Sequence, residues 1–436
     1  MISIEKKFIS YARSDDGLLI SHFILIHKGA VKNTLLSHAN LYLYSKTRNS
    51  KKTSSRYASI ISMFYRYLST LDEFAECEPS TYHTRVLNKH IRRWQDSREI
   101  ARVKQDKTRP SSVTIFEDAV LLMNYFRWLS DSNFPIAINI KIKTWIPHYK
   151  SARYQEYISV KAKDVIDSTS IRTLDRANRA RSFDGLITPY EVNALTENYS
   201  DPVYSTLLML ALGTAMRAMD VCGYPYYGNA ENSHIMPYSS MSFDGNTVLY
   251  KIFNSKGRKD RTIIIHKDIL KMIDDSYTRP LYPERAKKYE RKYGAKPPLS
   301  ILFLTKDGDP VTPDRIAQRT TAAKNKARLK DPTLRASLTF HDARDWWPTH
   351  YLIEAFGNKL LNSNETLFNY AVAQILLGQM GHGSIETTFK HYIAKATLLL
   401  SLYKGRGLEL VSATDLSATV FLNRLKNIDA ESNYDA

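Results

Sequence analysis

Five short polar motifs follow one another in a fixed order between residues 214 and 392 of this 436-residue chain. Each motif contains a side chain that can carry positive charge, transfer a proton or attack as a nucleophile. In chain order, the motifs are centred on Arg217, Lys256, the pair His341 and Arg344, His382, and Tyr392. This order would place cations, imidazole rings and a phenolic nucleophile around a single phosphodiester.

The two arginines are suited to holding an anion. Arg217 falls within a predicted apolar helix, residues 204–221, where a buried guanidinium is costly unless it is paired or meets an anion. Asp220, one turn later, could orient it, and a purely structural Arg217–Asp220 pair is the alternative. Two guanidinium groups such as Arg217 and Arg344 can hold the non-bridging oxygens of a phosphate by bidentate hydrogen bonds.

The other motifs are weaker when taken singly. His341 and Arg344 are predicted to share one helical face, and Trp346 and Trp347 indicate that this helix packs into a core. Lys256 lies in a predicted turn between two strands, where Lys259 and Arg261 compete for the same role.

His382 and Tyr392 belong together through their spacing. His382 follows a predicted helix end and turn, and Tyr392 falls about two turns into the next predicted helix. In a chain with 28 tyrosines, any one of them is normally structural. The spacing of Tyr392 from His382, and the Thr387–Thr388 pair between them, single it out.

Together these motifs resemble those of the tyrosine recombinase (phage integrase) family, of the mobile-element integrase type. The pattern of that family is Thr-Gly-x-Arg, a hairpin Lys, His-x-x-Arg, a Gly-His followed by Thr-Thr, and a Tyr, and it is matched in order over about residues 186–395. The sequence departs from the pattern in a few places. Ala215 replaces a Gly, Ala343 replaces a common Leu, Asp345 stands where a His is frequent, and Tyr392 is one residue further from His382 than in many members.

The resemblance implies a site-specific DNA recombinase that acts by transesterification through a 3′-phosphotyrosyl intermediate on Tyr392. It implies a phosphate clamp of Arg217 and Arg344 and a general acid, Lys256, for the leaving oxygen. His341 would be the base near the Tyr392 hydroxyl, His382 would donate a hydrogen bond to the phosphate, and Asp220 would support Arg217. No nucleotide cofactor and no metal are expected.

The implied partners are double-stranded recombination sites and other copies of the chain. We expect a homo-tetramer on DNA, a monomer or weak oligomer when free, and no membrane partner, with room for accessory DNA-bending proteins. Two other readings fit a similar set of residues: type IB topoisomerase-like relaxation, and a sequence-specific DNA-binding protein without catalysis. An RNA-binding or membrane-surface protein would rest on charge alone. Integration, excision and dimer resolution are not distinguished, although the long N-terminal part favours a mobile element.

The composition agrees with a DNA-binding protein in the bacterial cytoplasm, associated with the nucleoid during action. The 62 Lys and Arg residues against 44 Asp and Glu give a formal charge of +18, which favours polyanionic partners. The longest apolar run, residues 206–216, is shorter than the roughly 20 residues that cross a bilayer, and the N-terminus lacks the layout of a signal peptide. Two cysteines, Cys77 and Cys222, predict neither a disulfide scaffold nor a metal cluster.

The predicted fold class is mainly α with a small antiparallel β-sheet. Hydrophobic periodicity predicts helices over residues 53–71, 81–98 and 112–129, and strands over 247–253, 262–265 and 301–304. Thr188, Pro189 and Glu191 predict a capped helix start. The expected organisation is an N-terminal extension (1–50), a helical core DNA-binding domain (51–145), a basic interdomain linker (146–183), a mixed α/β catalytic domain (184–404) and a C-terminal tail that exchanges between protomers (405–436).

Overall fold

The computed structural model of the protein describes residues 2–12, 17, 19–29, 32–48, 50–105, 109–145, 163–171, 186–255, 259–357, 360, 370–382, 392–393 and 395–397. The chain divides into two compact units, Met1–Ser182 and Phe183–Ala436. Helices predominate, and the strands that are described pair in small antiparallel sheets. This confirms the predicted fold class. The predicted tail, residues 405–436, lies outside the described residues.

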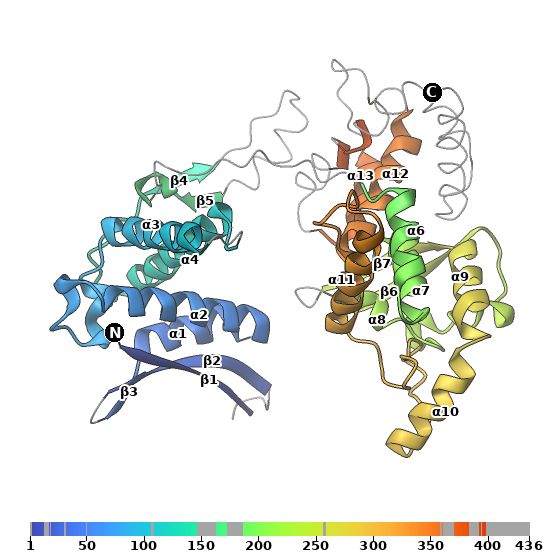
Figure 1. Cartoon of the computed structure of the whole chain (residues 1–436), viewed down its shortest axis with the longest axis horizontal. Helices are drawn as coiled ribbons and strands as arrows, with labels where there is room; N and C mark the ends of the chain where they lie inside the picture. Colours follow the sequence, from blue (N-terminus) through green and yellow to red (C-terminus); the bar gives the residue numbers. More distant parts are fainter. Residues whose placement is uncertain are drawn as a thin grey trace. The chain divides into compact units, whose positions relative to one another are not determined.

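The first unit begins with a three-stranded antiparallel sheet in the order β1-β2-β3. The strands are β1 (Ser3–Ala12), β2 (Leu19–Lys28) and β3 (Asn33–Leu35). Helices α1 (Ser37–Thr47) and α2 (Lys51–Leu68) lie along one face of this sheet (Figure 1). The inward residues of the strands, Ile4 and Leu25, are buried in the same core as the helices. The boundary expected at residue 50 is therefore absent, because one apolar core spans it.

Two further helices complete this unit. They are α3 (Asn88–Lys104) and α4 (Ser112–Asp131), and short 3₁₀ turns η1 (Asp72–Phe74) and η2 (Pro79–Thr84) precede α3. The predicted helix over 81–98 is thus two elements, with the longer one beginning at Asn88. Ser111 caps α4 by accepting a hydrogen bond from the Thr114 amide, as the Ser-rich start of that segment predicts.

Part of the predicted interdomain linker belongs to the first unit. Strand β5 (Lys163–Ile166) pairs antiparallel with β4 (Ile142–Trp145) and is followed by η3 (Ser168–Ile171). The Gln95 side chain of α3 donates a hydrogen bond of 2.8 Å to the Ile171 carbonyl. The linker expected over 146–183 is therefore not continuous, since residues 163–171 pack on the helices before it.

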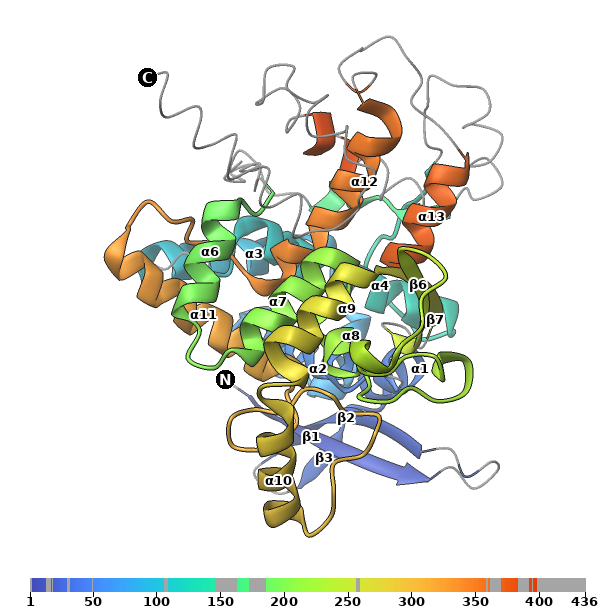
Figure 2. The same ribbon diagram turned by 90° about the vertical axis from the view of Figure 1, so that its right-hand side faces the viewer.

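The second unit is built around the buried helix α7 (Val203–Thr214), which α6 (Pro189–Asn198), α8 (Ala218–Cys222) and α9 (Lys267–Ile273) contact (Figure 2). The predicted capping box opens α6: the Glu191 amide donates to the Thr188 hydroxyl, and the Thr188 amide donates to the Glu191 carboxylate. The remaining elements are the 3₁₀ turns η4 (Ala230–Asn232) and η5 (Tyr238–Ser240), the hairpin strands β6 (Thr247–Ser255) and β7 (Lys259–His266), the π-helical turn η6 (Asp274–Thr278), and α10 (Tyr282–Tyr293), α11 (Pro313–Lys330), η7 (Phe340–Asp345), α12 (Trp346–Phe356) and α13 (Tyr370–Met380).

The predicted strand over 301–304 is wrong. Of these residues only Leu304 makes a β-bridge, to Pro310. Leu302, Phe303 and Leu304 are buried in the main core of the second unit. Burial of a short apolar run on all sides explains the strand-like pattern without a ladder of hydrogen bonds.

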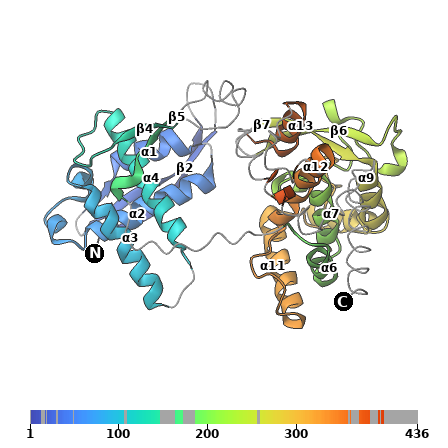
Figure 3. The same cartoon turned by 90° about the horizontal axis from the view of Figure 1, so that it is seen from above.

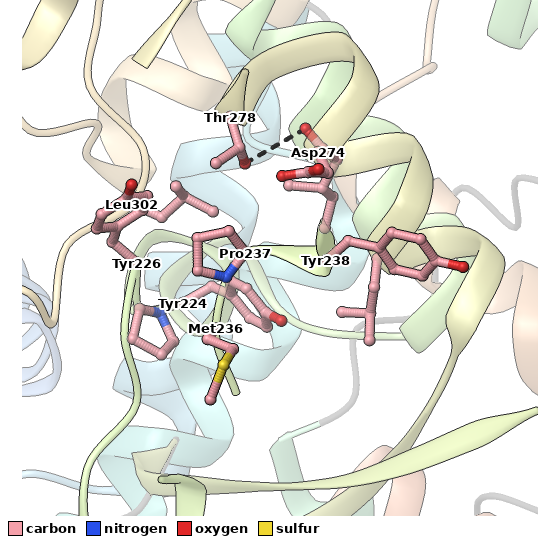
Figure 4. Close-up of a pocket in the computed structure, with 11 residues that line it drawn as sticks. Tyr224, Tyr226, Met236, Pro237, Tyr238, Asp274, Thr278 and Leu302 are labelled. Carbon is pink, nitrogen blue, oxygen red and sulfur yellow. Dashed lines mark hydrogen bonds between the residues drawn. The ribbon is translucent and has the colours of Figure 1, made fainter. Parts of the chain in front are cut away.

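A small cavity lies between the loop after α8 and η6 (Figure 4). Tyr224, Pro237 and Leu302 are among its lining residues, and its volume of about 10 Å³ leaves room for at most one water molecule. Substrate binding must be sought elsewhere. None of the helices in the described part of the chain is long and apolar enough to span a bilayer.

Candidate active site

A break between α7 and α8 positions Arg217. Helix α7 ends at Thr214, and Ala215 follows in the left-handed conformation with φ 55°. Arg217 is then the residue before the first turn of α8, and its backbone amide donates to the Asp220 carboxylate at 3.2 Å. The predicted continuous helix over 204–221 is therefore wrong. The left-handed conformation of Ala215 ends α7 and turns the chain. Arg217 therefore lies just beyond the C-terminal end of this buried helix.

Asp220 is the centre of a buried polar network. Its carboxylate accepts hydrogen bonds from the Ser255 hydroxyl at 2.9 Å and from Nη2 of Arg261 at 2.7 Å, and it lies 3.9 Å from Nη1 of Arg217. Nη1 of Arg217 also donates to the Ser255 hydroxyl at 3.1 Å. This geometry fits the supporting role expected for Asp220.

Arg344 reaches the same place from η7. Its side chain is 2% exposed, and Nη1 donates to the Ala215 carbonyl at 2.6 Å. In a 3₁₀ helix, residues three apart are one turn apart, so His341 lies one turn before Arg344 on η7, but His341 is exposed. Trp346 and Trp347 are buried, as the sequence predicts for the helix that follows.

Three guanidinium groups converge on the carbonyl oxygen of Met380, at the C-terminal end of α13. Nη1 of Arg261 donates to it at 2.6 Å, Nη2 of Arg217 donates at 3.2 Å, and Nη2 of Arg344 donates as well. A carbonyl oxygen has two lone pairs, so three charged donors exceed what it can accept well. The site therefore has donor capacity for an anion with several oxygens.

Burial lowers the pKa values of these arginines, but the cluster keeps its positive charge. Desolvation, followed by repulsion from Arg217 and Arg261, lowers the pKa of Arg344 to about 9. Desolvation also lowers the pKa of Arg261 to about 10, although the Asp220 carboxylate opposes that shift. These groups stay protonated at neutral pH, and a bound anion would relieve their mutual repulsion.

His382 lies next to this cluster, one residue beyond Gly381. It lines an open pocket of about 320 Å³ together with Arg217, Ser255 and Arg261. Desolvation, with repulsion from Arg344 and Arg217, lowers the pKa of His382 to about 4. The ring is neutral at pH 7 and can donate one hydrogen bond. Figure 3 shows α13, which ends just before this turn, beside β7, and the two elements are in contact.

Tyr392 completes the group. It is 3% exposed, and its ring stacks on His382 with centroids 6.4 Å apart and planes at 13°. Its hydroxyl donates to Oδ1 of Asp345 at 2.9 Å. Burial and the Asp345 carboxylate raise the pKa of Tyr392 well above the usual value, and Arg344 and Arg217 oppose the shift. The structure thus brings Tyr392, His382 and both predicted clamp arginines together.

Two parts of the predicted site are not in the described part of the chain. Lys256, in the turn between β6 and β7, lies outside the described residues, as do Thr387 and Thr388. Two further residues were not among those predicted to act. In the sequence Arg261 stands out only as a rival to Lys256, although its position next to the apolar run 262–265 is a signal for burial. Asp345 was noted only as a departure from the family pattern.

Comparisons with known proteins give one family match and several similar solved structures. Residues 186–398 match the model of the phage integrase family. Similar solved structures include the Tn1549 transposon integrase with a circular intermediate DNA (16% identity, 82% of this chain and 94% of that one, TM-score 0.45). Others are a lambda integrase dimer bound to a COC′ core site (16%, 82% and 95%, 0.43) and the XerH recombinase bound to palindromic difH (13%, 84% and 83%, 0.46).

No curated protein sequence matches the chain. The family match covers α6 to the helical residues around Tyr392, which is the part of the chain that holds every predicted site residue. Residues 186–398 therefore form a domain of the phage integrase family.

Proposed function

We propose that the protein cuts and rejoins double-stranded DNA at specific recombination sites through a covalent bond between Tyr392 and a DNA phosphate. The observation that carries this proposal is the position of the buried Tyr392 hydroxyl near Arg217 and Arg344, two of the three guanidinium groups that share one carbonyl oxygen. A nucleophile of this kind, next to guanidinium groups that can donate to phosphate oxygens, is suited to phosphoryl transfer.

The phosphate would be held by Arg217 and Arg344. Both already donate to the Met380 carbonyl, which carries the negative end of the α13 dipole. A phosphodiester offers two non-bridging oxygens that share one negative charge, so it can take over or share these donors. Arg261 keeps Asp220 and Met380 in place while this happens. The positive charge of the site also matches the charge that grows in the transition state.

Strand cleavage is a transesterification, in which one phosphate ester is exchanged for another. The Tyr392 oxygen bonds to phosphorus and loses its proton, and the bond from phosphorus to the 5′ oxygen breaks. Lys256 would supply the proton that the 5′ oxygen takes with it. In the second step a 5′-hydroxyl of a partner strand attacks the phosphotyrosine, and Tyr392 regains its proton. The ester bond energy is retained, so no nucleotide is consumed.

The two histidines have separate roles in this proposal. His382, neutral and beside the clamp, would donate a hydrogen bond to a non-bridging oxygen. His341 lies one turn before Arg344 on η7, and the family resemblance implies that it is the base for Tyr392. Its exposed side chain suits a contact to the DNA backbone equally well.

Recombination joins two DNA duplexes, so more than one copy of the chain must act together. The relatives named above are solved on a circular intermediate DNA, on a core site and on difH. We propose that this chain binds duplex recombination sites and assembles as a homo-tetramer on them. The tail, residues 405–436, would dock on a neighbouring protomer, since head-to-tail contacts close such rings.

A suicide substrate tests the chemistry. A duplex from the end of the element that encodes the protein is nicked near the cleavage site and incubated without metal or ATP. Wild type should give a slower-migrating protein band that carries labelled DNA on a denaturing gel, and Tyr392→Phe should not. Tight, salt-sensitive binding of this duplex by wild type without any adduct would instead identify a DNA-binding protein without catalysis.

A further inference from the structure

Asp345 holds the nucleophile and a lysine at the same time. Its Oδ1 accepts the hydrogen bond of 2.9 Å from the Tyr392 hydroxyl, and its Oδ2 accepts from Nζ of Lys395 at 2.5 Å. Lys395 is only 8% exposed, so this ion pair is largely shielded from water. One carboxylate thus links the oxygen that attacks the phosphate to a buried cation.

The local structure explains why these groups meet. Asp345 is the last residue of η7 and directly follows Arg344, so the phosphate clamp and the carboxylate share one short turn. Tyr392 and Lys395 are three residues apart in helical conformation, which puts both on one face toward Asp345.

We propose that Asp345 accepts the proton of the Tyr392 hydroxyl during DNA cleavage and that Lys395 positions the Asp345 carboxylate for this transfer. The inference rests on the proposed function, because it concerns one step of that reaction. It reassigns a role that the family resemblance gave to His341. It also gives a function to Asp345, which stands where a His is frequent in the family.

The proton that Tyr392 releases in the first step returns to it in the second. As the Tyr392 oxygen bonds to phosphorus, its proton moves to Oδ1 of Asp345. When the partner strand attacks and the phosphotyrosine bond breaks, Asp345 returns the proton to the departing Tyr392 oxygen. The carboxylate is regenerated, and no outside acid or base is consumed. The 5′ oxygen exchanges its own proton on the other side of the phosphate, with Lys256.

The surroundings favour this direction of transfer once DNA is bound. A phosphodiester brings negative charge next to Asp345, which increases the proton affinity of its carboxylate. The guanidinium of Arg344 stabilises the negative charge that develops on the Tyr392 oxygen as its proton leaves. The charged and titratable groups that the described residues place around Asp345 include Lys395, Tyr392, His341 and His382.

The first test is the rate of adduct formation by the full-length protein on the nicked duplex. Asp345→Asn is compared with wild type and with Asp342→Asn, a matched control on the same turn. Asp342 caps η7 by accepting from the Thr339 amide at 2.6 Å, a role that Asn can also fill. We expect Asp345→Asn to be slower by roughly a hundredfold or more, the usual range for a lost general base. Asp342→Asn should stay within a few-fold of wild type.

A second substrate distinguishes the loss of the base, Asp345, from the loss of the acid, Lys256. It carries sulfur in place of the 5′-bridging oxygen at the scissile phosphate, and a thiolate leaves without being protonated. We expect Lys256→Gln to regain its rate on this substrate and Asp345→Asn to stay slow. Asp345→His supplies a different base, and a free imidazole takes up protons at higher pH than a free carboxylate. This variant should recover part of the rate and move the acid limb of the pH–rate profile upward.

Lys395 is tested by Lys395→Gln, which should slow cleavage less than Asp345→Asn does, and by Lys395→Arg, which should restore most of the rate.

An adduct from wild type, combined with an unchanged rate and pH profile in Asp345→Asn, would overturn the inference and leave the proposed function standing. Recovery of Asp345→Asn on the sulfur substrate would also overturn it. No adduct from wild type would overturn both.

Discussion

Gly381 lies so close to Arg261 that a Cβ atom at this glycine would stand 2.5 Å from Nη1 of the arginine. Gly381 also has φ 58°, a conformation that side chains disfavour by roughly 1–2 kcal/mol. The residue links the end of α13 to His382, so the missing side chain leaves room for Arg261 to reach the Met380 carbonyl. The active site therefore depends on a glycine for space as well as for backbone shape.

Gly381→Ala should slow adduct formation strongly while leaving most of the fold intact. The added methyl group must push Arg261 away from Met380 and disturb His382. The matched control is Gly294→Ala at the C-terminus of α10, where φ is 73° and no atom lies within 4 Å of the added Cβ. Both variants carry the same kind of backbone strain, but only Gly381→Ala also crowds Arg261, so its thermal unfolding should shift at least as much as that of Gly294→Ala, and cleavage is compared per folded molecule. Equal cleavage rates in the two variants would contradict the crowding argument.

Arg261→Lys should reduce the cleavage rate at saturating DNA by about tenfold or more. A lysine has one nitrogen and cannot reach both Asp220 and the Met380 carbonyl, as the planar guanidinium does. Arg285 is a control of the same construction, because its guanidinium bridges Asp201 at 2.6 Å and the Leu304 carbonyl at 2.7 Å away from the site.

Arg285→Lys should lose a similar amount of stability without loss of cleavage rate per folded molecule. Denaturant unfolding and single-turnover cleavage of both variants make the comparison. If Arg261→Lys cleaves like wild type, or if its defect is confined to DNA affinity, Arg261 does not position the phosphate clamp.

Local signals predicted part of this structure well. The capping box of Thr188 and Glu191 and the β6–β7 hairpin both depend on residues within one turn or one hairpin of each other. In those places neighbouring side chains decide the conformation, so spacing and residue type suffice.

Other features depend on contacts between distant segments. Ala215 is a good helix former in isolation, yet it ends α7 in the left-handed region, where its carbonyl receives Arg344 across 129 residues. Arg261 meets partners 41 and 119 residues away. Propensity and short motifs carry no information about such pairs. The family pattern placed the clamp arginines, but only the folded chain brings Arg261 to them.

The first unit should lose stability as the pH falls below about 6.5. His38 is buried, its Nε2 hydrogen-bonds with the Tyr65 hydroxyl at 2.9 Å, and burial and the nearby His83 lower its pKa to about 3. At pH values between about 3 and 6.5, the unfolded chain binds a proton at His38 and the folded chain does not. The stability of the first unit therefore rises with pH over this range. The slope for one such histidine approaches about 1.4 kcal/mol per pH unit.

Denaturant unfolding at pH 7.5 and pH 5 tests this. In a background with Trp346 and Trp347 replaced by Phe, the remaining tryptophans belong to the first unit. His38→Gln should be less stable than this background at pH 7.5 but show a shallower loss toward pH 5. The loss will not vanish, because burial also lowers the pKa of His83 and His90 in this unit. An equal slope in both proteins would contradict the assignment to His38.

His382 should change its protonation when DNA binds. In the free protein its pKa is about 4, because the ring is desolvated and lies near Arg344 and Arg217. A phosphodiester in the clamp brings negative charge that favours the protonated ring, so its pKa should rise by at least one unit. Nuclear magnetic resonance of ring-labelled histidine in Tyr392→Phe, titrated with and without duplex DNA, measures both values, and His382→Gln identifies the signal. A free-protein pKa near 6.5 that does not move with DNA would mean that His382 lies apart from the phosphate, and its role as a hydrogen-bond donor would have to be abandoned.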